Sequence, residues 1–159
     1  MKKTKNVTSG GPVLRLAFLI YCALMLWLLF GQRLHTGLQD SQLIQLGLNI
    51  NLTPLHTLRQ YWGLLLSDNA YYVCHAVVNL VGNVVMFVPM GLFFPWIWPS
   101  LRRVWRMVLF TLVLLVLIEF TQYLTSLGSC DVDDLILNFP GVMFGYCFWY
   151  IGYALKRSA

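Results

Sequence analysis

Long runs of apolar residues alternate with short polar segments along the whole chain. A helix that rises about 1.5 Å per residue needs roughly 20 residues to cross a hydrocarbon core of ~30 Å. Four runs reach this length, and they predict transmembrane helices over about 14–31, 70–98, 104–127 and 134–155. The pattern therefore predicts an all-α fold, an integral membrane bundle of four helices.

Composition supports a single membrane domain. Of the 159 residues, 58% are hydrophobic and only 11% are charged, which is too apolar for an ordinary soluble fold. We place the domain at 13–155, between basic cytoplasmic ends at 1–12 and 156–159. The net charge of +5 is confined to short segments between apolar runs, which argues against a nucleic-acid partner.

The lysine and arginine residues predict the orientation. With four crossings, all of the 11 except Arg33 and Arg59 fall on one side. Positive residues accumulate in cytoplasmic segments, so both chain ends are expected in the cytoplasm. The basic start before an apolar run also resembles a signal peptide, but no small-x-small cleavage site follows Phe30. This favours a retained signal-anchor helix.

The segment from Gln32 to Asn69 is predicted to be an external loop. Its apolar part around 43–50 favours contact with the membrane surface or with the bundle. Pro54 breaks the chain, and an amphipathic stretch begins at Leu55. This stretch predicts either an interfacial helix with Tyr61 and other aromatic rings at headgroup level, or a simple connecting loop.

Polar side chains within the predicted crossings are costly in hydrocarbon and therefore mark functional sites or helix contacts. His75, Asn79 and Asn83 follow each other at helical spacing on one face, and Gly82 beside them predicts close helix approach. On the next crossing, Glu119 and Gln122 are three residues apart and therefore share a face of the helix.

The last crossing carries polar and small residues on one face. They are Asp134, Asn138, Gly141 and Gly145. Glu119 lies about 12 Å below the outer end of its helix, so residues of three helices can converge in the outer half of the membrane. We predict a pocket open to the outside, beneath an acidic rim of Asp131, Asp133 and Asp134.

The four cysteines are not spaced as metal ligands, and neither a metal nor a cofactor is predicted. Ordinary buried cysteine is the simplest interpretation. Cys74 and Cys130 nevertheless fall near the same outer surface, where an oxidising compartment would permit a disulfide.

Four motifs in order resemble the VanZ family. They are NLTPL (51–55, with Asn51 and Pro54), NLVGNVVMFVPMG (79–91), EFTQ (119–122) and DVDDLILN (131–138), followed by Gly141 and Gly145. The resemblance implies a small multi-pass protein of the bacterial cytoplasmic membrane, in a family named for a member associated with teicoplanin resistance.

Three functions are compatible with the polar cluster. The first is a non-enzymatic envelope protein that binds or admits a polar or amphiphilic ligand, such as a cell-wall precursor, a lipid headgroup or a glycopeptide. The second is an intramembrane enzyme acting on a lipid-linked substrate, with Glu119 as acid or base and Asp131, Asp133 and Asp134 holding a divalent cation. The third is a structural role in which these residues join helices. No obvious nucleophile accompanies the cluster, which favours binding.

The predicted orientation can be tested with reporter fusions. Fusions after Gln39 and Gly128 should report the extracytoplasmic side, and fusions after Arg103 and Arg157 the cytoplasm, because the positive residues partition in this way. A cytoplasmic signal at Gly128 would contradict the four-crossing topology.

Overall fold

The computed structural model describes residues 11–31, 50–125 and 130–158. Expectations for the basic N-terminus, for the apolar loop segment 43–49 and for residues 126–127 of the third crossing lie outside these residues. The same holds for Arg33 and Asp40.

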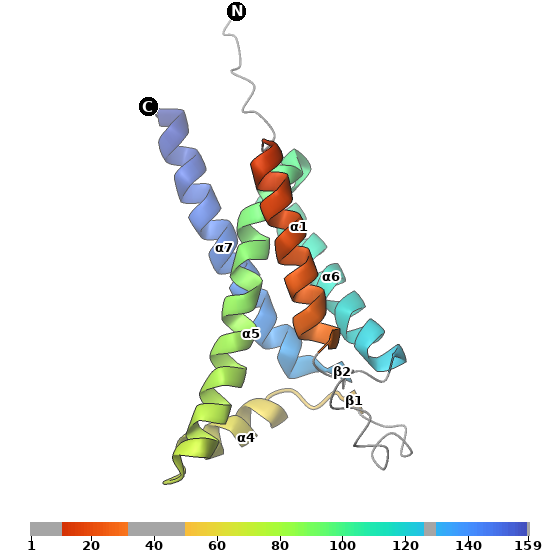
Figure 1. Ribbon diagram of the computed structural model, residues 1–159, viewed down its shortest axis with the longest axis vertical. Coiled ribbons are helices and arrows are strands. Elements are labelled where there is room, and N and C mark those ends of the chain that lie inside the picture. The colour runs from red at the N-terminus through yellow and green to blue at the C-terminus, as the bar shows by residue number, and fades with distance from the viewer. Residues whose placement is uncertain (1–10, 32–49, 126–129, 159) are drawn as a thin grey trace, which may run out of the picture.

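Four long helices form the body of the molecule (Figure 1). They are α1 (Pro12–Leu26) with the π-helical turn η1 (Trp27–Gly31), α5 (Ala70–Ile97), α6 (Val104–Leu124) and α7 (Val132–Ser158). Each is long and apolar enough to cross a membrane, which confirms the predicted four-helix membrane bundle. Successive helices run in opposite directions, so α1 begins and α7 ends at the same end of the bundle (Figure 1).

The shorter elements lie at the two ends of the bundle. The 3-10 turn η2 (Pro99–Arg102) connects α5 to α6. At the opposite end, β1 (Ile50–Asn51) pairs in parallel with β2 (Cys130–Asp131), with Asn51 opposite Asp131. The pattern of apolar positions did not predict this two-residue pairing.

The amphipathic stretch after Pro54 forms the helix α4 (His56–Leu65) rather than a simple loop. It lies across the lower end of the bundle and contacts α5 (Figure 1). Trp62 and Leu66 keep 65% and 75% of their surface exposed, so an apolar edge faces outward at the level where the long helices begin or end. This arrangement suits a helix at the membrane interface.

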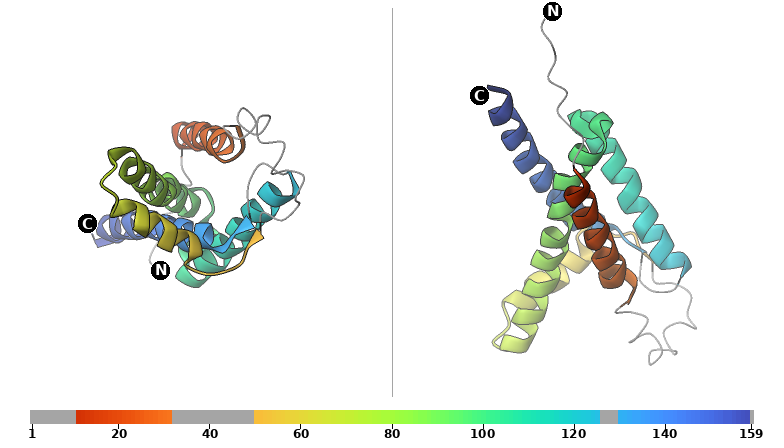
Figure 2. Two further views of the ribbon diagram at one scale, coloured as in Figure 1. Left: turned by 90° about the horizontal axis from the view of Figure 1, so that it is seen from below. Right: turned by 45° about the horizontal axis from the view of Figure 1, so that its top comes forward.

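The helices α5 and α7 cross in direct backbone contact (Figures 1 and 2). A methyl group built at Gly141 would overlap the carbonyl oxygen of Val84, and one at Gly145 would overlap that of Val88. Gly91 of α5 is equally close to the backbone of α7. Small residues therefore permit the crossing, as in other membrane helix pairs.

Gly82 does not take part in this contact. A Cβ atom at this position would have no atom within 4 Å, so the prediction of close helix approach at Gly82 is wrong. The residue faces open space in the bundle, two residues before Val84, where α5 first contacts Gly141 of α7.

An apolar core fills the half of the bundle nearer to η2. It includes Phe87, Phe94, Met107 and Val142 from three helices. The helix α1 lies at the periphery beside α5 (Figure 2, left), where the Tyr21 hydroxyl donates a hydrogen bond of 2.9 Å to the Met86 carbonyl.

Two alanine substitutions on α7 should differ in their effect on stability. Gly145→Ala should lower the free energy of unfolding by about 1–3 kcal/mol, because α5 and α7 must separate to admit the methyl group. Gly152→Ala is the matched control, since nothing lies within 4 Å of its Cβ position. It should be neutral or stabilising by up to about 1 kcal/mol. Unfolding in mixed detergent, followed by circular dichroism, measures both; equal stability of the two variants would contradict the backbone contact.

Candidate functional site

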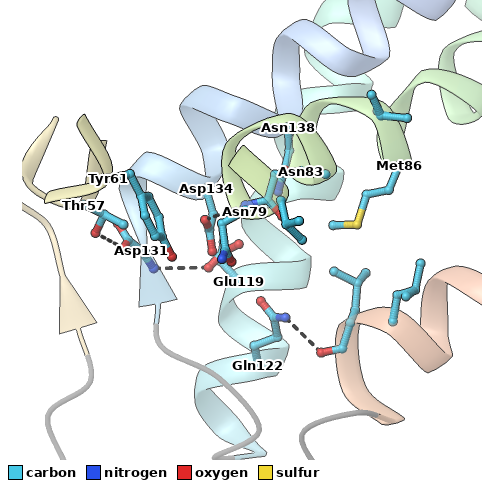
Figure 3. A pocket seen from close by; sticks show the side chains of 15 residues that line it. Thr57, Tyr61, Asn79, Asn83, Met86, Glu119, Gln122, Asp131, Asp134 and Asn138 are labelled. Carbon is cyan, nitrogen blue, oxygen red and sulfur yellow. Dashed lines mark hydrogen bonds between the residues drawn. The ribbon is translucent and has the colours of Figure 1, made fainter. Parts of the chain in front are cut away.

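A cavity of about 770 Å³ lies between the long helices on the α4 side of the crossing (Figure 3). The helices α5, α6 and α7 supply most of its wall, while α4, the turn η1 and Asp131 of β2 complete it. Its lining residues are Leu28, Leu29, Thr57, Tyr61, Val78, Asn79, Gly82, Asn83, Val85, Met86, Glu119, Gln122, Asp131, Asp134 and Asn138.

The cavity collects nearly all of the side chains predicted for the pocket. Every one of them except Asp133 lines it, and Gly82 lines it as well instead of packing against a helix. Asp133 is fully buried and turns toward α4, so the predicted acidic rim of three aspartates is not formed.

Asp131 connects four elements at the edge of the cavity. Its Oδ2 accepts a bond of 2.6 Å from the Thr57 hydroxyl of α4, and its Oδ1 accepts one of 3.2 Å from Asn51 Nδ2 of β1. Its backbone N–H donates to Glu119 Oε2 of α6 at 3.2 Å (Figure 3). Its Oδ1 also accepts from the N–H of Asp133 at 2.9 Å, at the start of α7. One residue thus holds the segments around the cavity in register.

Asp133 caps α4 from across the fold. Its carboxylate accepts three backbone N–H groups, from Leu55 at 2.6 Å, Thr57 at 2.7 Å and Leu58 at 3.1 Å. The first N–H groups of a helix have no partner within the helix and carry a partial positive charge, so a carboxylate satisfies them well. Leu55 adopts a left-handed conformation with φ of 65°, which a leucine rarely does.

The polar face of α6 reaches the cavity through two residues. Glu119 and Gln122 continue the buried face of α6 that begins with Met107, Thr111 and Leu115. Gln122 Nε2 donates to the Leu29 carbonyl at 3.2 Å, in the last turn of the first membrane helix. Carbonyls at a helix end lack intrahelical partners, so Gln122 both satisfies this one and attaches η1 to α6.

Three asparagines form the rest of the polar wall. Asn83 Nδ2 donates to Asp134 Oδ1 at 3.2 Å, which joins α5 to α7. Asn79 Nδ2 donates to the His75 carbonyl at 2.8 Å. Asn138 is only 3% exposed, and its Oδ1 is buried without a hydrogen-bond partner among the described residues.

The described lining carries three carboxylates and no lysine, arginine or histidine. The negative charge extends to the cavity edge, where burial, followed by the charges of Glu119 and Asp131, raises the pKa of the Cys130 thiol. A raised pKa lowers the thiolate fraction and so disfavours Cys130 as a nucleophile. All four cysteines are free thiols, including the pair considered for a disulfide.

In the part of the chain that the structure describes, no three His, Cys, Asp or Glu side chains are placed to hold a metal ion. The alternative in which Asp131, Asp133 and Asp134 share a divalent cation is therefore not supported. The physical reason is that the Asp133 carboxylate accepts hydrogen bonds from backbone N–H groups at the start of α4 and therefore does not face the other two aspartates.

Several site residues were not predicted from the sequence. Thr57 was not identified, and Tyr61 was expected to point toward the headgroups instead of the cavity. Their i, i+4 spacing on α4 places them on one face, and this is the signal that could have found them. In the loop motif, Asn51 binds Thr57 and Asp131, whereas Pro54 lies in the exposed turn before α4.

Comparison with protein families identifies the class of membrane protein to which this arrangement belongs. The model of the VanZ/LLP1 family matches residues 18–153, which include α5, α6, most of α1 and α7, and every residue that lines the cavity. The chain therefore belongs to the VanZ/LLP1 family, as the motifs indicated. Searches of curated proteins and of solved structures found no match.

Asp133→Asn should loosen α4 without unfolding the bundle. The amide replaces one acceptor oxygen with a donor that faces backbone N–H groups, so we expect a local loss of about 3 kcal/mol. Hydrogen exchange at the Thr57 and Leu58 amides should then accelerate about a hundredfold. The matched control is Asp68→Asn, at an exposed position between α4 and α5. Unchanged exchange in Asp133→Asn would show that the carboxylate does not hold α4.

Proposed function

We propose that this protein binds the polar headgroup of an amphiphilic cell-envelope molecule in the cavity between α5, α6 and α7. The observation that carries the proposal is the cavity itself, whose volume of about 770 Å³ falls in the usual range for small-molecule sites. If these polar residues only joined the helices, their side chains would be expected to hydrogen-bond directly to one another and leave no cavity.

The division of the wall favours an amphiphile. One part is made of amide and carboxylate groups, and the other part is apolar. The apolar residues are Leu28, Leu29, Val78, Val85 and Met86. A headgroup can exchange hydrogen bonds with the first part while an attached chain contacts the second. Asn138 Oδ1 is buried and has no hydrogen-bond partner in the described part of the chain. A ligand that donates a hydrogen bond to this oxygen would gain binding free energy from it.

Because the chain belongs to the VanZ/LLP1 family, we expect it to bind this ligand in the bacterial cytoplasmic membrane. The ligands that fit this setting are a cell-wall precursor, a lipid headgroup or a glycopeptide. Binding of such a molecule at the outer half of the membrane would account for a role in resistance to teicoplanin.

A second candidate function is an intramembrane enzyme that uses carboxylates on a lipid-linked substrate. One observation favours it: the Thr57 hydroxyl lies 2.6 Å from Asp131 Oδ2 at the cavity wall, as a hydroxyl and its general base would. Against it, the same hydroxyl also accepts a bond from Asn51 at 3.1 Å, which is typical of a structural network.

Gly82→Leu tests the binding proposal. The added side chain would enter open space in the cavity, so the protein should fold normally while ligand binding falls at least about tenfold. Gly152→Leu is the matched control, because it adds the same atoms at a position that is equally open but outside the cavity. The readouts are amphiphiles that co-purify with each variant, identified by mass spectrometry, and the teicoplanin susceptibility of cells expressing it.

Wild-type behaviour of Gly82→Leu in both readouts would contradict the proposal. Replacing Glu119 separates the alternatives within the same assays. Glu119→Gln keeps an acceptor for the Asp131 N–H, so it should fold in every case. If Glu119→Gln still binds the ligand but no longer converts it to a product, the result would favour the enzymatic function. Wild-type behaviour of Glu119→Gln combined with misfolding of Glu119→Leu would favour the structural role.

A further inference from the structure

The end of the bundle opposite the cavity carries a pair of cations from two different elements. Arg102 of η2 donates from Nε to the Pro95 carbonyl at 3.0 Å, and its Cζ lies 5.5 Å from the centre of the Tyr153 ring. Lys156 Nζ lies 5.4 Å from the centre of the Trp96 ring. Pro95 and Trp96 are neighbours on α5, and Lys156 follows Tyr153 by one turn of α7. Both cations therefore contact neighbouring residues at the same end of α5 and α7.

Unused hydrogen-bond donors accompany this pair. Arg102 Nη2 and Trp149 Nε1 are both buried without a partner among the described residues. The Trp149 ring stacks on the Tyr153 ring with their centres 5.0 Å apart, so the indole adjoins the ring under the guanidinium. Trp149 itself is only 3% exposed. Both unused groups are donors, so the group that would satisfy them is an acceptor, and next to two cations an anionic one.

The chain offers no such acceptor nearby in sequence. Neither the segment 95–106 nor the segment 141–159 contains an aspartate or a glutamate. Exposed apolar side chains flank the cations along the membrane helices, among them Trp105, Phe148 and Leu155. An anion with acyl chains would fit this surface better than a free anion, because its chains could cover these side chains.

We infer that the Arg102–Lys156 pair binds the phosphate of an anionic phospholipid in the leaflet at this end of the bundle. Basic groups between the ends of membrane helices recognise such headgroups, and the leaflet expected here is the cytoplasmic one. The guanidinium would donate to the phosphate from the nitrogen atoms that the Pro95 carbonyl does not occupy, while the ammonium group adds charge from α7. This site is separate from the cavity and does not depend on the function proposed for it.

Native mass spectrometry of the full chain, delipidated and then titrated with phosphatidylglycerol or with phosphatidylcholine of matched acyl chains, tests the site. We expect one phosphatidylglycerol to be retained in preference to phosphatidylcholine. Lys156→Gln and Arg102→Gln should each weaken its binding about tenfold. The matched controls are Arg103→Gln and Arg157→Gln, which remove the same charge from exposed positions at the same end and should change binding by less than about twofold.

Three results would overturn the inference. Equal losses in all four variants would indicate a diffuse positive surface, and equal retention of the two lipids would exclude recognition of an anionic headgroup. Competition by glycerol phosphate as strong as that by phosphatidylglycerol would indicate a site for free phosphate. Arg102 also packs against Tyr153, so its variant can fail to fold. The exposed Lys156 then decides the question alone.

Discussion

The backbone contact between α5 and α7 determines where most of the cavity groups lie. Gly91, Gly141 and Gly145 allow the two helices to touch with no side chain between them, and this fixes the face that each helix turns toward the other. On the α4 side of the contact the helices diverge, and Asn83 of α5 meets Asp134 of α7 across the widening space. The cavity is therefore a direct consequence of a crossing that is close at the middle and open at one end.

Hydrogen bonds, rather than apolar burial, hold α4 and β1 beside this opening. No residue of α4 is buried, so packing alone would leave the helix weakly attached. Asp133 and Asp131 compensate by binding its first turn through the backbone and through Thr57. Carboxylates that bind helix N-terminal amides are especially effective where water is scarce, because the alternative is an unsatisfied group. The position of Thr57 and Tyr61 at the cavity thus depends on the start of α7.

The sequence predicts the helices well because crossing a bilayer requires long apolar runs, and a period of 3.6 residues then assigns Glu119, Gln122, Asn79 and Asn83 to faces. The sequence does not predict the role of a residue when the same residue type can occupy two different structural settings. A glycine such as Gly82 can admit a neighbouring helix or leave a space, and periodicity does not distinguish these. The role of Asp133 depends on a partner segment more than 70 residues away, and the pairing of β1 with β2 is too short to produce an alternating pattern.

The charges of α7 connect the two ends of the molecule. Asp133 and Asp134 lie in its first turn and Lys156 and Arg157 in its last, and each pair is stabilised by the partial charge of the helix end where it lies. The same distribution predicts that the basic end faces the cytoplasm. Since α7 contributes Asp134 and Asn138 to the cavity, the residues that orient the helix also decide which leaflet the cavity opens toward. Reversing the charges of α7 would therefore oppose the expected orientation of this helix in the membrane and would place each charge at the helix end whose partial charge repels it. With the basic end in the cytoplasm, the cavity is expected in the half of the bundle that faces away from the cytoplasm.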